Sequence, residues 1–360
     1  MIKMILVSKQ DVYAFVIGED VLGGGGGGSI KEGLELGTIA TEIDTVRIVQ
    51  PDEIEEDKTV VTVSDVGIQS NGKTEKEQYV RSVELLKIYG INVEGLIPSE
   101  CGAIGTVNGW IQSTILKIPV LDSPCDGRAH PTGLMGSMGL HRLREFVSIQ
   151  AAVGKRIGDT FSEILVKGEL ESVSKIVRAF STISGGSAAV ARNPINARYV
   201  IQNGAPGALT LCKKIGDSIL KENEPYNKIK AAMRPIRGTI ICEGIVTKKI
   251  LKNKEGFDVG IIEIEDSTEA KCRISFVNEY MTLDIQEKRL AVFPDLINVF
   301  NLKTGLPVNS AEVKLKDSVA VTKVSRENLL LGSGLKYPEV YEPVRALLEP
   351  EICPISFTQP

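Results

Sequence analysis

The chain has 360 residues, 42% of them hydrophobic and 24% charged, which is ordinary for a globular protein with room for two domains. A formal net charge of −4 without any long basic block argues against nucleic acid as the principal partner. Only two histidines are present, which excludes a histidine-rich metal centre, and no apolar stretch could span a membrane, so a cytoplasmic protein without a membrane partner is expected.

Near the N-terminus, a run of glycines over residues 23–28 precedes Ser29 and a helical pattern over 31–40. Glu32 stands three residues after Ser29, the spacing of a capping box, so Ser29 is expected to cap this helix. A glycine loop that leads into a helix N-terminus can offer backbone N–H groups to a polar or anionic ligand. The predicted substrate-binding residues of this loop are Gly25, Gly26, Gly27, Gly28 and Ser29.

The glycine run has a second interpretation as a flexible surface hinge, because such runs are common in linkers. No Lys-Ser/Thr pair follows the glycines, so the run is not a P-loop, and its unbroken spacing is not that of a dinucleotide fingerprint. No nucleotide cofactor is therefore expected. The loop by itself still leaves a phosphate-ligand binder as a weaker alternative.

The next part of the chain alternates short apolar runs with helical patterns. Strands are predicted over 59–63, 93–97 and 118–122, and helices over 74–89 and 105–116. This alternation predicts an α/β domain with a parallel or mixed sheet covered on both faces. Ligands of such sheets bind beyond the carboxyl ends of the strands, where Glu100 and Asp122 lie.

Further along, two strands are predicted within 146–166, followed by helices over 169–183 and 208–220. After a change in composition at 233–235, alternating runs predict an antiparallel, β-rich domain. Its strands are expected over 238–250, 258–265, 270–277, 289–293 and 319–324, with a hairpin loop at 253–256 and an irregular tail over 337–360. The predicted domains are 1–167, which carries the glycine loop, and 168–356, with a helical part over 168–232 and a β-rich part over 233–332.

The densest polar cluster is the turn-rich segment 122–131. In it, Arg128 could clamp a substrate carboxylate through two hydrogen bonds. Asp122 or Asp126 could act as a general base, and Cys125 as a nucleophile if Arg128 stabilised its thiolate. The structural alternative is a polar loop in which an Asp caps a turn and Arg128 forms an ion pair. Because binding residues concentrate on loops at strand ends, the whole cluster favours function.

Three other polar residues follow predicted strands. Glu100 comes directly after an apolar strand, so it either faces a cleft or caps the next helix. Asn278 ends an apolar stripe, and Asp295 follows an apolar run. On the sequence alone, Asn278 and Asp295 are interpreted as ordinary turn residues at strand ends, and His141 as a structural histidine.

The chain offers little for a metal site. Its six cysteines lie far apart without a CxxC pair, which predicts reduced and mostly buried thiols. A divalent metal held by Asp122 and His130 would make a water more nucleophilic, but no ligand spacing supports one. The cofactor therefore stays unknown, with these two residues as the candidate metal ligands.

Several fragments of the chain resemble the sequence motifs of a known protein family. They are LGGGGGGSIKEG at 22–33, IPSECG at 97–102, IPVLDSPCDGRAHP at 118–131, GGSAAVA at 185–191, the segment 204–219, GFDVG at 256–260, FVNE at 276–279 and FPDLI at 293–297. In this order, and over nearly the whole chain, they resemble the S-methyl thiohydantoin desulfurase family, earlier grouped with hydantoin-utilisation and hydantoinase-like proteins.

The resemblance implies a two-domain protein, α/β followed by a β-rich part. It also implies an activity similar to hydrolysis at the amidine-like carbon of a five-membered thiohydantoin ring, with release of a methylthiol. Glu100, Asp122, Arg128, Asn278 and Asp295 match polar positions of the family pattern.

The chain departs from the family pattern at three positions. Pro124 stands where the family has a second loop Asp, His130 where it has Phe, and Gly105 where an Asn is expected. These differences bear on the substrate and on the chemistry.

Two functions are therefore expected. The first is a hydrolase of a cyclic ureide or thiohydantoin-type small molecule, acting on a C–S or C–N bond, with Glu100 or Asp122 as general base. In it, Arg128 would hold a substrate carboxylate and the glycine-loop amides would stabilise negative charge. The second is a non-catalytic ligand-binding subunit that partners a hydantoinase- or oxoprolinase-type enzyme, which Pro124 and Gly105 favour. A homo-oligomer is compatible with either function.

Overall fold

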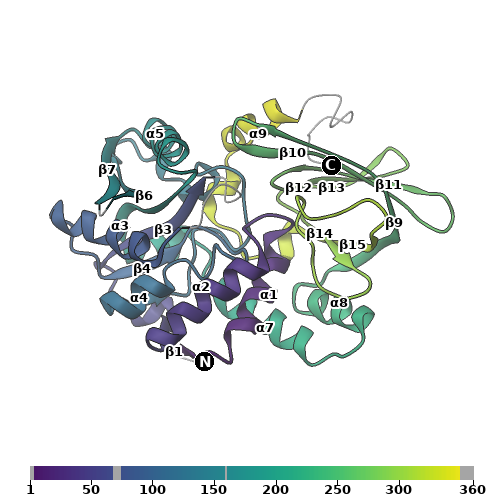
Figure 1. Cartoon of the computed structure of the whole chain (residues 1–360), viewed down its shortest axis with the longest axis horizontal. Helices are drawn as coiled ribbons and strands as arrows, with labels where there is room; N and C mark the ends of the chain where they lie inside the picture. Colours follow the sequence, from purple (N-terminus) through teal and green to yellow (C-terminus); the bar gives the residue numbers. More distant parts are fainter. Residues whose placement is uncertain (1–3, 68–73, 159, 349–360) are drawn as a thin grey trace.

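The computed structural model describes residues 4–67, 74–158 and 160–348. It contains an eight-stranded sheet with its helices and, beside it, a seven-stranded sheet (Figure 1). In the described part of the chain, no helix is long and apolar enough to cross a membrane.

The eight-stranded sheet is mixed, with the strand order β1-β2-β5-β4-β3-β8-β6-β7. Its centre is parallel, from β2 through β5 and β4 to β3. β1 pairs antiparallel at one edge, and β8, β6 and β7 pair antiparallel at the other. The strands are β1 (Met4–Val7), β2 (Val46–Val49), β3 (Thr59–Gly67), β4 (Gly95–Pro98), β5 (Val120–Leu121), β6 (Ser148–Ile157), β7 (Thr160–Gly168) and β8 (Ser187–Asn196).

Helices cover both faces of this sheet, as alternation along β8 shows. Ala189 belongs to the large core cluster that includes side chains of α3 (Lys76–Ile88). Its neighbour Ala188 packs in a separate cluster with side chains of α5 (Leu170–Ile183). Because successive side chains of a strand point to opposite faces, α3 and α5 lie on opposite sides of the sheet. The predicted parallel or mixed sheet, covered on both faces, is confirmed.

The helix before the glycine loop is held against α7 (Ala208–Leu220) at very short range. In α1 (Val12–Gly23), a Cβ at Gly18 would clash with the carbonyl of Cys212. A Cβ at Gly216 of α7 would in turn clash with the backbone of Ala14. The two helices therefore pack backbone to backbone, and this contact fixes where the glycine loop begins.

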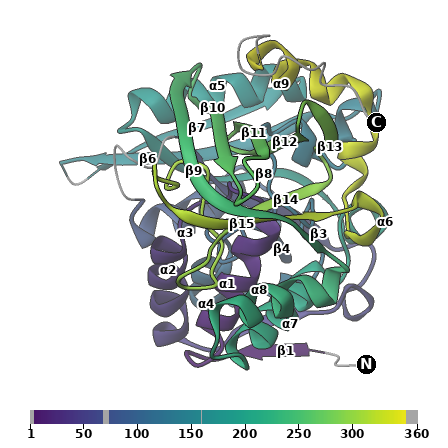
Figure 2. The same ribbon diagram turned by 90° about the vertical axis from the view of Figure 1, so that its right-hand side faces the viewer.

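The seven-stranded sheet is antiparallel throughout, in the order β13-β12-β11-β10-β9-β15-β14. Figure 2 shows its longest strand, β9, as a curved ribbon across this face of the molecule. The predicted hairpin at 253–256 joins β9 to β10. The strands are β9 (Thr239–Lys254), β10 (Phe257–Glu265), β11 (Lys271–Val277), β12 (Glu279–Ile285), β13 (Lys288–Val292), β14 (Leu296–Asn301) and β15 (Ser318–Val324).

The remaining helices connect or flank these layers. They are α2 (Ile30–Ile43), α4 (Trp110–Leu116), α6 (Ala197–Asn203), α8 (Pro225–Met233) and α9 (Glu342–Leu347), with single 3-10 turns between them. The seven-stranded antiparallel sheet confirms the predicted β-rich second part of the chain.

The structure differs from the predicted elements in several places. The helix expected over 105–116 begins only at Trp110, because the preceding residues form turns that end in Gly109 with φ of 104°. The strands β1, β2, β8, β12 and β14 and the helices α1, α6 and α8 were not predicted. Within the predicted irregular tail, residues 342–347 form α9, and residues 349–360 lie outside the described part. The eight-stranded sheet includes β8, beyond residue 167, so the exact domain boundary stays a prediction.

Candidate functional site

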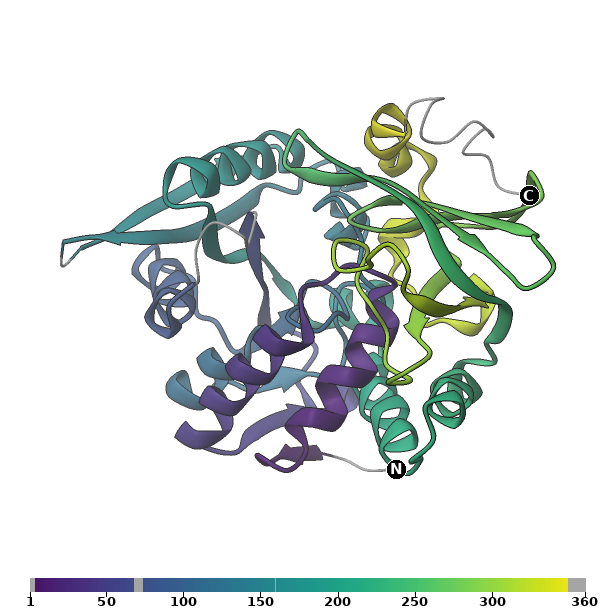
Figure 3. The same ribbon diagram turned by 45° about the vertical axis from the view of Figure 1, so that its right-hand side comes forward.

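The glycine loop lies between the two sheets and is packed on both sides. Figure 3 shows the loop between α1 and α2 beside the segment that joins β14 to β15. The Ser310 N–H donates to the Gly25 carbonyl at 2.9 Å, and the Ile104 N–H donates to the Gly27 carbonyl at 2.8 Å. Since Gly23 to Gly26 are buried, the interpretation as a flexible surface hinge is wrong.

Protein atoms occupy the space that side chains would need in this loop. A Cβ at Gly25 would lie 2.5 Å from the Tyr280 ring, and one at Gly26 would clash with the carboxyl of Glu279. At Gly27, a Cβ would lie 2.6 Å from the Cα of Gly102. The glycines are therefore needed for the contact between the two parts of the fold, in addition to any contact with a ligand.

A matched pair of substitutions should isolate this contact. Gly90 has φ of 93° and open space around its Cβ position, whereas Gly27 has φ of 77° and a backbone neighbour that cannot rotate away. We expect Gly90→Ala to lower the free energy of unfolding by about 1 kcal/mol, from backbone strain alone. Gly27→Ala should cost roughly 3 kcal/mol or more, because overpacking adds to that strain.

Urea denaturation of both variants and the wild type measures this difference. Equal losses for Gly27→Ala and Gly90→Ala would show that the loop relaxes and that close packing does not explain the glycines.

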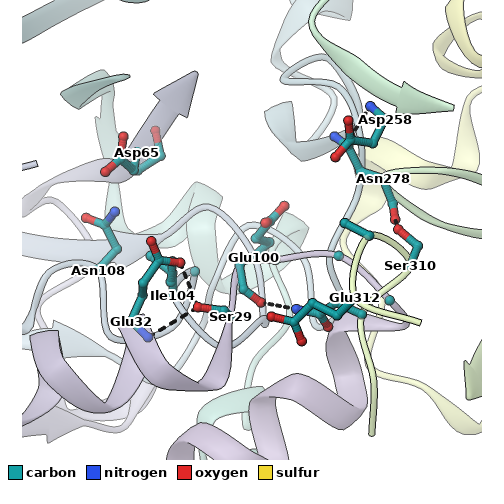
Figure 4. Close-up of a pocket in the computed structure, with 18 of the residues that line it drawn as sticks. Ser29, Glu32, Asp65, Glu100, Ile104, Asn108, Asp258, Asn278, Ser310 and Glu312 are labelled. Atoms are coloured by element: carbon teal, nitrogen blue, oxygen red, sulfur yellow. Dashed lines mark hydrogen bonds between the residues drawn. The ribbon is translucent and has the colours of Figure 1, made fainter. Parts of the chain in front are cut away.

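The loop borders a cavity of about 610 Å³ between the two sheets. Figure 4 shows Glu100 near its middle, with Asp65 and Asn108 on one side and Asp258 and Asn278 on the other. The residues that line it are Gly25, Gly26, Gly27, Gly28, Ser29, Lys31, Glu32, Glu35, Ser64, Asp65, Gly67, Ser99, Glu100, Ile104, Gly105, Asn108, Asp258, Asn278, Asn309, Ser310, Ala311 and Glu312.

The N-terminus of α2 opens into this cavity. Ser29 caps the helix as predicted, since its Oγ accepts from the Glu32 N–H at 3.3 Å and donates to the Glu32 carboxylate at 2.7 Å. Among the described residues, the backbone N–H groups of Gly27 and Gly28 have no acceptor. Two free N–H donors beside a helix N-terminus can stabilise negative charge that develops on a bound molecule.

Glu100 is the predicted catalytic carboxylate that reaches the cavity. It follows β4 and accepts a hydrogen bond from the His130 backbone N–H at 3.2 Å. Burial raises the pKa of Glu100 to about 7, although the backbone hydrogen bond from His130 and the charges of Arg192 and Arg128 oppose the rise. A carboxyl group with a pKa near neutrality is suited to proton transfer.

The His130 ring packs against Glu100 and the backbone of Ser99. Its Nε2 lies 3.3 Å from the Ser99 carbonyl and 3.5 Å from the Glu100 carboxylate. Burial lowers the pKa of His130 to about 4, so the ring is neutral at neutral pH. Because a carbonyl can only accept, we assign the proton to Nε2.

Asp122 does not line the cavity. Its carboxylate is fully buried and caps α7, accepting from the Leu209 N–H at 2.8 Å and from the backbone and hydroxyl of Thr210. Gln50 donates to it at 3.0 Å. The position of Asp122 supports neither of its predicted roles, a general base or a metal ligand, and its cap on α7 differs from the alternative of an Asp that caps a turn.

Arg128 is also buried, between the two parts of the fold. It donates to the carbonyls of Pro294 and Asp295 at 2.9 and 2.7 Å, and its guanidinium lies 4.2 Å from the centroid of the Phe293 ring. The Asp295 carboxylate pairs with Arg326 at 2.9 Å. Neither Arg128 nor Asp295 lines the cavity. In this structure, Arg128 therefore does not reach a substrate carboxylate in the cavity, as the predicted clamp requires.

Cys125 and Asp126 are enclosed in the core as well. Burial raises the pKa of the Cys125 thiol to about 11, and its Sγ lies 3.2 Å from the hydroxyl of Thr62. Burial raises the pKa of Asp126 to about 8, and this residue accepts from the Gly332 N–H at 3.1 Å. A thiol with a raised pKa is a weak nucleophile, so the predicted role of Cys125 loses its physical basis.

Asn278 lines the cavity and also organises it. It has φ of 56°, its N–H donates to the Asp258 carbonyl at 2.8 Å, and its Oδ1 accepts from the Asp258 N–H at 2.9 Å. These bonds fix the position at which Asp258 borders the cavity. His141 is structural as predicted, with Nδ1 at 3.1 Å from Ser137 and Nε2 at 3.2 Å from Glu339.

The cysteines match the prediction of reduced thiols where the structure describes them. Cys101, Cys125, Cys212 and Cys272 are buried and Cys242 is half-buried, all as free thiols, and Cys353 lies outside the described residues. In the described part of the chain, no three His, Cys, Asp or Glu side chains are grouped so that they could hold a metal ion. Asp122 and His130, the candidate metal ligands, are engaged in the separate contacts given above.

Sequence reasoning missed most of the residues that line the cavity. Ser64, Asp65 and Asn108 line it from β3 and from the turn before α4. Asp258 lines it from β10, and Glu312 from the segment that joins β14 to β15. A short polar interruption, Ser64-Asp65, at the end of an apolar β-branched run was the signal available for β3.

This fold and site define a class: two-part α/β and β proteins with a polar cavity beside a glycine loop. Family models of that class match the chain over residues 10–157, described as S-Me-THD-like, N-terminal domain, and over 168–335, described as S-Me-THD-like, C-terminal domain. The chain belongs to the S-Me-THD-like family, that of S-methyl thiohydantoin desulfurase.

A crystal structure of a protein from Chromobacterium violaceum is similar, with a TM-score of 0.74 and 17% sequence identity over 98% of each chain. This likeness concerns the fold. No curated protein matches the sequence.

Proposed function

We propose that the chain is a hydrolase of a thiohydantoin-type ring that binds in the cavity, with Glu100 as general base. The family name indicates a thiohydantoin-related function. The observation that carries the proposal is the position of Glu100, a carboxyl with a pKa of about 7 in the cavity wall beside the free N–H groups of the glycine loop.

For an S-methyl thiohydantoin, the reaction consumes one water. Glu100 takes a proton from this water, and the water oxygen bonds to the ring carbon that carries sulfur. The N–H groups of Gly27 and Gly28 stabilise the negative charge that develops on the ring. The charge on the ring nitrogen then re-forms the C=N bond as the C–S bond breaks, and the methylthiolate takes up the proton held by Glu100. The proton of the new ring hydroxyl moves to the ring nitrogen, so methanethiol and a hydantoin leave.

Arg128 acts at a distance in this scheme. Its guanidinium lies behind the glycine loop, where a Cβ at Gly24 would come within 2.9 Å of Nη2. Its positive charge lowers the pKa of Glu100 and of Glu279, in opposition to burial. Arg128 is therefore a positioning residue, which keeps Glu100 ionisable near neutral pH.

Incubation of the purified protein with S-methyl thiohydantoin, thiohydantoin and hydantoin tests the proposal. We expect methanethiol release from the first compound, detected with a thiol reagent, and formation of hydantoin by chromatography. A ring that binds without any C–S or C–N cleavage would contradict it and favour the ligand-binding subunit of a hydantoinase- or oxoprolinase-type enzyme. A pull-down would then identify that partner.

A further inference from the structure

The cavity is strongly acidic. Its only basic side chain among the described residues is Lys31, whereas six carboxylates line it: Glu32, Glu35, Asp65, Glu100, Asp258 and Glu312. A free carboxylate or phosphate on a ligand would meet like charges in a confined space, which is unfavourable. The carboxylates of the cavity wall therefore disfavour anionic ligands relative to cationic ones.

Two carboxylates on the α/β side, Asp65 and Glu32, have no cationic partner among the residues that the structure describes. Asp65 is held in place by Tyr79, whose hydroxyl donates to its Oδ2 at 2.8 Å. No described Lys or Arg nitrogen lies within 4.0 Å of Asp65 or Glu32. Burial and the nearby charge of Glu32 raise the pKa of Asp65 to about 6, which a bound cation would reverse.

Two neutral side chains beside Asp65 are an independent sign of a ligand. Ser64 and Asn108 line the cavity with only 4% and 3% of their surface exposed. The Ser64 Oγ and the Asn108 Nδ2 have no hydrogen-bond partner among the described residues. Buried polar atoms are normally paired, so a bound molecule is the expected partner, offering a donor to Ser64 and an acceptor to Asn108.

We propose that the ring bound in this cavity carries an alkylammonium or guanidinium substituent, whose positive charge lies beside Asp65 and Glu32. The inference rests on the proposed function for the ring, and it names the substrate class. An ammonium group donates to Ser64 and pairs with Asp65, while a ring carbonyl accepts from Asn108. The proposed ligand of this wall is an organic cation and not a metal ion, because the described residues contain no group of three ligating side chains that could hold a metal ion.

Calorimetric titration with three hydantoins that carry an aminoethyl, an ethyl or a carboxyethyl substituent tests this proposal. We expect the aminoethyl compound to bind roughly 10-fold or more tightly than the ethyl compound, and the carboxyethyl compound to bind most weakly. Asp65→Asn and Glu32→Gln should each remove most of this preference. Asp258→Asn, a carboxylate on the opposite wall, is the matched control and should retain most of it.

Butylammonium and butyrate, which lack the ring, separate this inference from the proposed function. Binding of butylammonium that depends on Asp65, without turnover of any ring, supports the cation site and contradicts the hydrolase. Ring hydrolysis with equal affinity for the ethyl and aminoethyl compounds supports the hydrolase and overturns the cation site. An ammonium preference that persists in both folded variants, Asp65→Asn and Glu32→Gln, also overturns it.

Discussion

Replacement of Glu100 by Gln should lower kcat for the ring substrate by about 10²–10⁴-fold, the usual contribution of a general base. The amide has the same shape, and its oxygen can still accept the hydrogen bond from the His130 N–H, which is 3.2 Å long in the wild type. The ring should therefore still bind with a similar Kd. Steady-state kinetics together with calorimetric binding measures both quantities.

The pH profile provides a second readout that a structural role would not produce. A general base works in its ionised form, so kcat should rise with pH through about 7, the pKa to which burial raises Glu100, and level off above it. In Glu100→Gln this limb should disappear. A matched substitution of the exposed Glu77, Glu77→Gln, should change neither kcat nor its profile.

The same pKa has a consequence for stability. Because the pKa of Glu100 is higher in the folded state than its ordinary value of 4.5, the folded state holds the proton more tightly. The resulting stabilisation is complete below pH 4.5 and is lost as the pH rises through about 7. Glu100→Gln should therefore gain stability relative to the wild type above pH 7, which thermal unfolding across pH measures.

A residual kcat above roughly a tenth of the wild-type value would remove Glu100 from the role of base.

The sequence leaves Glu100 either to face a cleft or to cap a helix, and the structure places it in the cavity wall, because its position depends on local rules. It follows a short apolar strand in the parallel centre of the sheet, where ligand sites lie beyond the strand ends. The glycine loop and the Ser29 cap are local features as well, set by backbone freedom and by a spacing of three residues. Such features can be predicted without knowledge of the tertiary contacts.

Asp122 shows where local rules fail. It also follows a parallel strand of the sheet, yet its carboxylate meets α7, whose first turn comes 87 residues later in the chain. Arg128 likewise finds its acceptors 166 and 167 residues away, in the turn between β13 and β14. A single sequence does not contain these pairings, so a buried structural charge and a catalytic one have the same local pattern.

Asp122→Ala is expected to lower the free energy of unfolding by roughly 3 kcal/mol, among the larger effects of a single substitution. The substitution removes the cap of α7 and leaves the Leu209 N–H, the Thr210 N–H and the Gln50 amide without their acceptor in a buried site. Asp122→Asn keeps one acceptor oxygen and should cost about half as much. Asp52→Ala, at an exposed position, should lie within about 0.5 kcal/mol of the wild type.

Activity measured on the folded fraction separates this role from catalysis. Since α7 packs backbone to backbone on α1, which ends in the glycine loop, partial unfolding of Asp122→Ala will lower total activity. At a temperature where urea denaturation shows the variant to be folded, its kcat and pH profile should match the wild type. Glu100→Gln should do the reverse, with stability kept below pH 7 and raised above it, and with kcat lost. A folded Asp122→Ala protein with kcat reduced about 10²-fold would restore Asp122 to the catalytic site and show that the cavity closes around it during turnover.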